Sequence, residues 1–258
     1  MNFPTKGPSR KSKIVRNLES KVKSAIYSYG LIESNDTVMV AISGGKDSLA
    51  MLDLLINLGR SMPDKFTIEA CHIQAVDMPY KVDEDFMKSF CEANKTPLHF
   101  RQITVDYKID ERKPACFICS WKRRKALFAI ARERGCNKLA FGHHLDDAVE
   151  TLLMNMIHHS SISSIPPKLS MFEGDLQIIR PLITVHDKEL VEYNSYMGFP
   201  DEISLCPYED KTNREEVRNL IMKAEKLNRS ARENIFRSMA NIYPEYIVKG
   251  TENKKTSE

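Results

Sequence analysis

The chain has 258 residues, of which 42% are hydrophobic and 28% are charged, and its formal net charge is +3. This balance is typical of a globular protein and excludes the fibrous and intrinsically disordered classes. No apolar run approaches the roughly 20 residues that a membrane-spanning helix needs, and the basic N-terminus lacks the pattern of a secretory signal. We therefore expect one main domain in the cytoplasm, without membrane contact.

The predicted elements alternate between helices and strands. Residues 10–30 carry apolar side chains at helical spacing among basic ones, and Gly30 stands where this helix would end. Residues 37–42 form a short apolar run that is typical of a buried parallel strand. Further strands are predicted over 66–76, 98–105, 137–142 and 176–179, and further helices over 48–58, 81–94, 117–134, 145–158 and 187–198. The alternation predicts an α/β fold with a parallel twisted sheet and helices on both faces.

Four segments are predicted along the chain. A basic N-terminal helix (1–30) precedes the main α/β domain (31–205), a helical C-terminal extension (206–248) follows it, and residues 249–258 have the composition of a disordered tail. Within the main domain, the Ser- and Pro-rich stretch 160–175 is expected to run over the surface as a flexible excursion. Local basic faces are predicted where Lys and Arg cluster, at 6–24, 108–113, 122–125 and 132–138.

The segment SGGKDS (43–48) follows the first predicted strand and opens a helix. Such a turn presents free backbone N–H groups and the positive end of a helix to an anion, here most naturally a phosphate. Gly44 and Gly45 allow close approach of the backbone, Lys46 adds charge, and Ser43 and Ser48 add hydroxyl donors. The spacing fits neither of the common nucleotide-binding patterns, GxxxxGKS/T and GxGxxG. It resembles the SGGxDS signature of the PP-loop ATP pyrophosphatase superfamily, whose members cleave ATP between the α- and β-phosphates and adenylate a substrate oxygen.

The cysteines supply a second motif. Cys116 and Cys119 form a CxxC where a loop enters a helix, which alone is compatible with a redox dithiol, half of a zinc site or part of an iron–sulfur site. Its position in the chain does not suit a thioredoxin-like site, and the second pair that an all-cysteine zinc site needs is missing. With the distant Cys206, the pair could hold three irons of a [4Fe–4S] cluster and leave the fourth iron open to a sulfide or a substrate, although three thiolates also permit a zinc or a [3Fe–4S] form. The remaining cysteines are expected in the core or on the surface, at positions 71, 91 and 136.

A third motif, FGHHLDD (141–147), follows the strand predicted over 137–142. Ligands of open α/β sheets bind at the carboxyl ends of strands, so this turn should face the same crevice as SGGKDS. Asp146 and Asp147 could hold Mg²⁺ over the phosphates, because this ion prefers hard oxygen ligands. Alternatively, either aspartate could cap the following helix, and His143 could be a packed, hydrogen-bonded side chain.

Taken together, these motifs resemble one branch of the superfamily, the tRNA 2-thiocytidine synthetase (TtcA) family. The resemblance runs in order through AISGGKDSLAML, CFICSWKRRKAL, LAFGHHLDDAVETLLMNM, IIRPLI, Cys206 and NIFRSMANIYPEYI, and covers almost the whole chain. It implies an enzyme that adenylates the C2 oxygen of cytidine 32 in the tRNA anticodon loop and replaces that oxygen by sulfur. It also implies tRNA and a sulfur donor system such as a cysteine desulfurase as partners, and a homodimer.

The resemblance carries residue roles as well. A [4Fe–4S] cluster would be held by Cys116, Cys119 and Cys206, while ATP would be bound by Ser43, Gly44, Gly45, Lys46, Asp47, Ser48, Gly142, His143, Asp146 and Asp147. Arg180 matches the arginine of an RPL motif and would lie near phosphate or tRNA. Some relatives carry a second CxxC at the distal position, whereas this chain reads CPYED (206–210), which keeps three ligands but lacks a spare thiol for a persulfide. The sulfur would then bind to the iron that has the open coordination position.

Contacts with RNA are predicted next to the cysteine pair. Trp121 is followed by Lys122, Arg123, Arg124 and Lys125, and this aromatic and basic stretch could face an unpaired RNA loop. The same helix must also bury an apolar stripe, so Trp121 could equally belong to the core. The basic N-terminal helix is another candidate for contacts with the phosphate backbone.

Three other functions remain open on the sequence alone. One is iron–sulfur-dependent thiolation of a different tRNA base, of the 2-thiouridine or 2-thiothymidine type, whose enzymes usually carry extra cysteine pairs that this chain lacks. Another is a lysine-adding tRNA cytidine ligase, which shares the ATP loop but has no need of three cysteines. A function of a different class is a nonenzymatic iron–sulfur or nucleotide sensor that binds RNA.

Overall fold

The structure is a computed structural model that describes residues 13–77, 82–106, 114–200 and 214–248. The strands are β1 (Thr37–Ala41), β2 (Thr67–Ala75), β3 (Leu98–Ile103), β4 (Lys138–Ala140), β5 (Lys168–Met171) and β6 (Leu176–Ile179). The helices are α1 (Lys13–Tyr29), α2 (Lys46–Ser61), α3 (Glu84–Ala93), α4 (Ala115–Glu133), α5 (Leu145–His159), α6 (Asp187–Met197), α7 (Arg214–Leu227) and α8 (Ala231–Ser238), with short 3₁₀ turns η1 (Phe172–Gly174) and η2 (Pro244–Tyr246).

The strands form one sheet in the order β3-β2-β1-β4-β6-β5, in which every pair is parallel except β5 with β6. β1 is central, and Val40 lies opposite Ala70 on one side and Ala140 on the other. The chain order along the sheet reverses between β1 and β4, because β2 and β3 lie beyond β1 on one side and β6 lies beyond β4 on the other. In a doubly wound sheet this switch point opens a crevice at the carboxyl ends of the strands.

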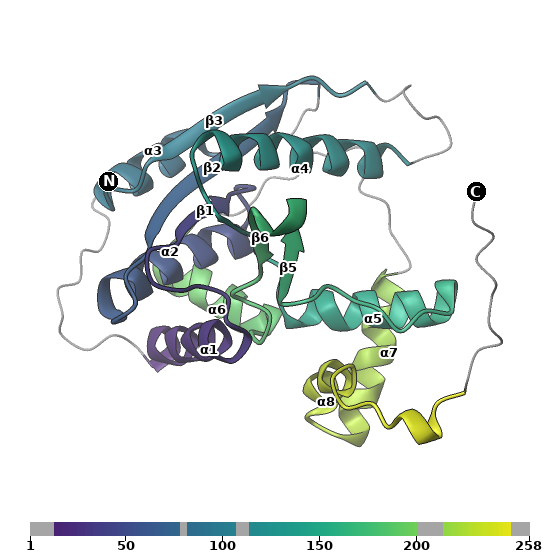
Figure 1. The fold of residues 1–258 in the computed structure, drawn as a ribbon. Coiled ribbons are helices and arrows are strands. Elements are labelled where there is room, and N and C mark those ends of the chain that lie inside the picture. The colour runs from purple at the N-terminus through teal and green to yellow at the C-terminus, as the bar shows by residue number, and fades with distance from the viewer. Residues whose placement is uncertain (1–12, 78–81, 107–113, 201–213, 249–258) are drawn as a thin grey trace.

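Helices cover both faces of the sheet, as predicted (Figure 1). Alternate residues of β1 point to opposite faces, because side chains alternate along a strand. Met39 packs with Leu127 and Ile130 of α4, whereas Val38 and Val40 join the larger cluster on the other face.

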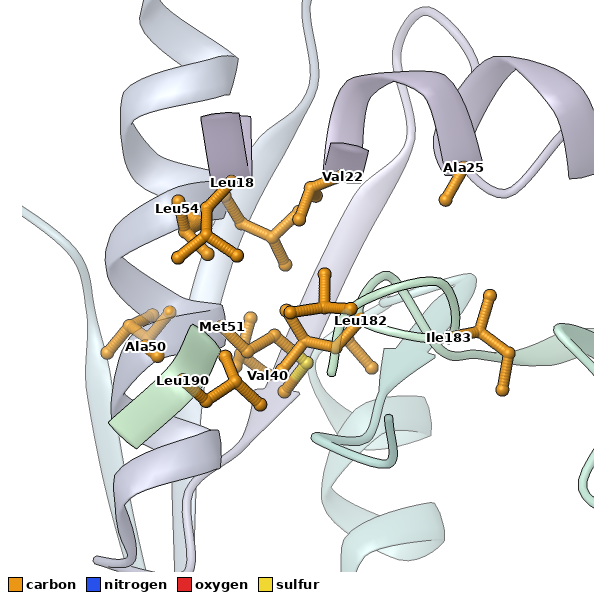
Figure 2. Close-up of a cluster of buried hydrophobic side chains, with 14 of the residues drawn as sticks. Leu18, Val22, Ala25, Val40, Ala50, Met51, Leu54, Leu182, Ile183 and Leu190 are labelled. Atoms are coloured by element: carbon orange, nitrogen blue, oxygen red, sulfur yellow. The ribbon is translucent and has the colours of Figure 1, made fainter. Parts of the chain in front are cut away.

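The larger cluster unites elements from both ends of the chain. Figure 2 shows part of it, with Leu18 and Val22 of α1 beside Leu54 of α2 and Leu190 of α6. Val217 of α7 and further apolar residues of α8 belong to the same cluster. The predicted N-terminal helix and C-terminal extension therefore share the core of the α/β domain.

The predicted excursion over 160–175 was wrong in part, because residues 168–171 form the edge strand β5. β5 runs antiparallel to β6, with Leu169 opposite Ile178. A strand of four residues beside Pro166 and Pro167 gives little local signal, and it exists through pairing with β6. Among the described residues, no helix combines the length and apolarity needed to cross a bilayer.

Candidate active site

The SGGKDS segment forms a tight turn between β1 and α2. The Ser43 backbone N–H donates to Ser48 Oγ at 3.1 Å, the Gly45 N–H donates to Ser43 Oγ at 3.1 Å, and Ser48 Oγ–H donates to the Gly45 carbonyl at 2.8 Å. Gly44 has a φ of +95°, a conformation that glycine adopts without steric cost. The two serine hydroxyls thus stabilise the turn, and Ser43, Asp47 and Ser48 also line a cavity.

This cavity has a volume of about 310 Å³ and lies at the switch point of the sheet. Its apolar part is formed by side chains from β2, from α4 and from the ends of β1 and β4, namely Ile42, Ile73, Leu127 and Phe141. Its polar part comes from the SGGKDS turn, from His143 and Asp147 after β4, and from Ser120, Arg123 and Arg124 of α4. One apolar wall and one cationic wall, next to the N-terminal end of α2, suit a ligand with a ring system and phosphates.

Gly142 is the contact point between the two predicted motifs. A Cβ atom at this position would lie 3.2 Å from the backbone carbon of Asp47 and 3.2 Å from the backbone nitrogen of Ser48. The FGHHLDD turn can therefore pack directly against the SGGKDS turn only because residue 142 has no side chain.

Replacing Gly142 with alanine should push these two turns apart and weaken ATP binding roughly tenfold, since overpacking of this kind typically costs about 1–3 kcal/mol. Titration calorimetry with a non-hydrolysable ATP analogue measures the change. Gly59→Ala is the control, because the nearest atoms that its new Cβ would meet belong to side chains, Phe66 at 3.4 Å and Ile68 at 3.8 Å. Equal affinity of Gly142→Ala and wild type would show that the packing of the two turns does not shape the ATP site.

Arg180 does not line the cavity, but it interacts electrostatically with Arg124 and His143, which do. Burial lowers the pKa of Arg180 to about 10, with Arg124 acting in the same direction, so Arg180 stays charged at neutral pH. Its Nη1 donates to the Pro166 carbonyl, while its buried Nε has no hydrogen-bond partner. Burial lowers the pKa of His143 to about 4. The charge of Asp147 would raise this pKa, but burial and the charges of Arg180 and Arg124 together outweigh it. His143 is therefore neutral at pH 7 and adds no charge to the cationic wall of the cavity.

Lys46 and Asp47 belong to a charged cluster beside the cavity. Lys46 Nζ lies 2.8 Å from Asp47 Oδ1 and 2.6 Å from Asp187 Oδ1. Burial alone would lower the pKa of Lys46, but the hydrogen bonds to Asp187 and Asp47 outweigh it and the pKa is raised. His144 Nε2 lies 3.9 Å from Asp47 Oδ2 and 3.7 Å from Asp187 Oδ1. One ligand atom each of Asp47, His144 and Asp187 lies within 4.8 Å of the others, which is compact enough to hold a metal ion.

The sequence prediction did not include His144 and Asp187 in this site. Asp187 is the first residue of α6 and follows β6 by only a few residues, so the rule that ligands bind at the carboxyl ends of strands could have found it. His144 is adjacent to the predicted His143, but sequence alone could not say which imidazole lies among the carboxylates.

The two predicted aspartates have different surroundings. Asp147 lines the cavity and also caps α5, because its Oδ2 accepts from the His144 backbone N–H at 3.0 Å. Asp146 is buried, accepts from the Asp187 backbone N–H at 2.9 Å and forms an ion pair with Arg232 of α8. Asp146 thus links α5, α6 and α8, whereas Asp147 is available to a ligand in the cavity.

The cysteine pair lies in the first turns of α4. Cys116 is exposed and Cys119 is partly buried, and their spacing of three residues places them on one side of the helix. Cys206 lies outside the described residues. Cys71, Cys91 and Cys136, which the sequence assigned to the core or the surface, are buried, and burial raises their thiol pKa values to between about 11 and about 12.

The predicted RNA-binding side chains fall on two sides of α4. Arg123 and Arg124 line the cavity, so their charge faces the phosphate-binding wall. Lys122 lies instead over the Trp121 ring, with Nζ 5.8 Å from the ring centroid. Trp121 is 48% exposed and is therefore not a core residue.

Comparison with known proteins places this site in a family. The PP-loop domain family matches residues 11–225. The tRNA-cytidine(32) 2-sulfurtransferase of Vibrio campbellii is 34% identical over 92% of this chain and 81% of its own length, and that of Polynucleobacter necessarius is 36% identical over 93% and 80%. Among solved structures, the U34-tRNA thiolase NcsA of Methanococcus maripaludis with its [4Fe–4S] cluster matches with a TM-score of 0.74 and 25% identity, over 93% of this chain and 81% of its own.

Proposed function

Because the chain belongs to the PP-loop domain family, and within it to the tRNA-cytidine(32) 2-sulfurtransferases, we propose that it uses ATP to replace the C2 oxygen of cytidine 32 in tRNA by sulfur. The observation that carries this proposal is the layout of α4. Its first turns bear Cys116 and Cys119, and the next turns bear Ser120, Arg123 and Arg124 of the cavity wall. A single helix thus joins a cysteine pair to a nucleotide-type cavity.

The cavity supports the activation half of the reaction. Adenylation converts the C2 oxygen of the base into a phosphoester, which is a far better leaving group, and pyrophosphate departs. The negative charge of the phosphates repels the incoming oxygen and must be offset, and Arg123, Arg124 and the N-terminal end of α2 supply positive potential for this. Lys46 remains charged because its pKa is raised, so it can pair with the departing pyrophosphate.

We place the Mg²⁺ that accompanies ATP at the carboxylates of Asp47 and Asp187, with Asp147 and His144 at the edge of the group. His144 lies beside these carboxylates, with its imidazole more than nine-tenths buried and its Nε2 3.9 Å from Asp47 Oδ2 and 3.7 Å from Asp187 Oδ1. His144 Nε2 also lies 3.5 Å from Asp147 Oδ2. The ammonium of Lys46 lies between Asp47 and Asp187 and forms an ion pair with each. These two carboxylates therefore already bind one positive charge.

Asp187→Asn should raise the Mg²⁺ concentration needed for half-maximal pyrophosphate release roughly tenfold, since one anionic ligand is lost. A pyrophosphate assay across a Mg²⁺ series measures this. Asp175→Asn, at an exposed position after η1, is the control and should leave the Mg²⁺ dependence unchanged. An unaltered Mg²⁺ dependence in Asp187→Asn would assign the metal to other residues.

We propose that Cys116, Cys119 and Cys206 hold a [4Fe–4S] cluster. Cys116 is exposed, Cys119 is partly buried, and the two lie on one side of a helix, as two ligands of one cluster must. When bound through three protein thiolates, such a cluster supplies an iron with an open coordination position that can accept sulfide. A sulfur donor system such as a cysteine desulfurase would then deliver the sulfur. The proposed active form is a homodimer.

The second candidate is thiolation of uridine 34, and the similarity to the archaeal U34-tRNA thiolase favours it. Both candidates need pyrophosphate release that depends on tRNA, whereas a nonenzymatic sensor would release none. The test is therefore pyrophosphate release from ATP by the purified protein with and without tRNA, with Asp47→Asn as the inactive control. Pyrophosphate release that requires tRNA and Asp47 supports an enzyme. No pyrophosphate release by protein that contains its iron–sulfur cluster contradicts the proposal.

A further inference from the structure

Helix α4 is apolar on two different sides. One side is buried against the sheet and includes Ile118, Leu127 and Ile130. On the other side Phe117 is 51% exposed and Trp121 is 48% exposed. Residues four apart in a helix lie above one another, so the two rings form one surface about one turn long. Exposed aromatic side chains grouped in this way typically mark a binding surface.

Basic side chains surround these rings. The ammonium groups of Lys122 and Lys125 lie 5.8 and 5.5 Å from the centroid of the Trp121 ring, and Arg124 lies in the next turn. No acidic residue occurs between Pro114 and Arg132 in the sequence. We call Phe117, Trp121, Lys122 and Lys125 the aromatic–basic face. Its charge is complementary to a polyanion, and its rings are suited to stacking.

The face adjoins both parts of the proposed active site. Cys116 precedes Phe117 directly, and Ser120 and Arg123, which line the cavity, lie between and beside the two aromatic positions. Figure 1 shows α4 extending along the outer side of the sheet, with its N-terminal end beyond the carboxyl ends of β2 and β3. The face therefore lies on the same helix as the cysteine pair and part of the cavity wall.

We propose that the aromatic–basic face stacks an unpaired anticodon-loop base that neighbours the target base, with Lys122 and Lys125 contacting the adjoining phosphates. This inference rests on the proposed tRNA substrate. Unpaired bases stack on aromatic side chains irrespective of sequence, whereas paired bases cannot. The face thus favours loops over duplex RNA and holds the loop while the target base occupies the cavity.

Trp121 is the only tryptophan of the chain, so its fluorescence reports on this face alone. Titration of the wild-type protein with an anticodon stem-loop RNA should quench that fluorescence to saturation, and a fully paired RNA of equal length should not. Trp121→Leu should bind the stem-loop roughly tenfold more weakly in a filter-binding assay, and Phe117→Leu should show a smaller loss. Trp121→Phe keeps a stacking ring and should bind within about twofold of wild type.

Tyr246→Leu is the matched control, because this ring is 84% exposed in η2, far from α4 in Figure 1. ATP affinity should be unchanged in all four variants. If wild type releases pyrophosphate with tRNA but Trp121→Leu binds the stem-loop as tightly as wild type, the inference is wrong and the proposed function stands. If wild type neither binds the stem-loop nor responds to tRNA, both are overturned.

Discussion

Cys119→Ser is expected to abolish formation of 2-thiocytidine, with a loss of roughly a hundredfold or more, while ATP binding stays unchanged. A serine hydroxyl is not ionised at neutral pH and cannot replace a thiolate on iron, whereas the ATP cavity does not include the Cys119 side chain. The measurement combines iron content, the visible absorption of the cluster and mass spectrometry of thiolated nucleosides. ATP affinity is determined on the same preparation by calorimetry.

Cys136→Ala is the matched control for this variant. Cys136 is buried behind α4, and burial raises the pKa of its thiol to about 11, so it stays protonated and is a poor metal ligand. The control should retain iron and thiolation. A Cys119→Ser protein with full iron content and normal 2-thiocytidine formation would contradict the assignment of the CxxC to the cluster.

Arg232→Met should lower the free energy of unfolding by about 3 kcal/mol, because it leaves Asp146 buried without its cationic partner. Methionine retains most of the aliphatic volume, so the loss of charge dominates. Urea denaturation measures the effect, and Arg229→Met, at an exposed position three residues earlier, should change stability by less than about 0.5 kcal/mol.

The same variant separates two roles for Asp146. If Asp146 links helices, Arg232→Met lowers stability but leaves the Mg²⁺ dependence of pyrophosphate release as in wild type. If Asp146 binds Mg²⁺, release of its carboxylate from Arg232 should change the Mg²⁺ dependence. Unaltered stability together with altered Mg²⁺ dependence would contradict the linking role.

Much of the fold could be predicted from the sequence because local signals agree with the tertiary structure. Residues 38–42 are all apolar, since β1 is central and its middle residues are buried. The Gly-rich turn after β1 predicts that the strand ends there and that a helix begins. Even so, α2 begins at Lys46 and not at Ser48, because Gly45 serves as the N-cap and its carbonyl accepts from both Ser48 and Leu49.

The parts that could not be predicted depend on contacts between distant segments. β5 has four residues and exists by pairing with β6, which leaves no periodic pattern in 160–175. Asp187 enters the metal-binding group only because α6 begins beside the SGGKDS turn. Likewise, the spacing in α4 could not decide whether Trp121 is core or surface, because that helix carries apolar residues on both sides.

The central claim is that this chain thiolates cytidine 32 of tRNA. The most direct measurement is mass spectrometry of tRNA nucleosides from a strain lacking the gene, complemented with wild type or with Cys206→Ala. We expect 2-thiocytidine to be lost in the deletion strain and restored by wild type alone. Unchanged 2-thiocytidine in the deletion strain, with loss of a thiolated uridine, would contradict the cytidine assignment and favour the second candidate.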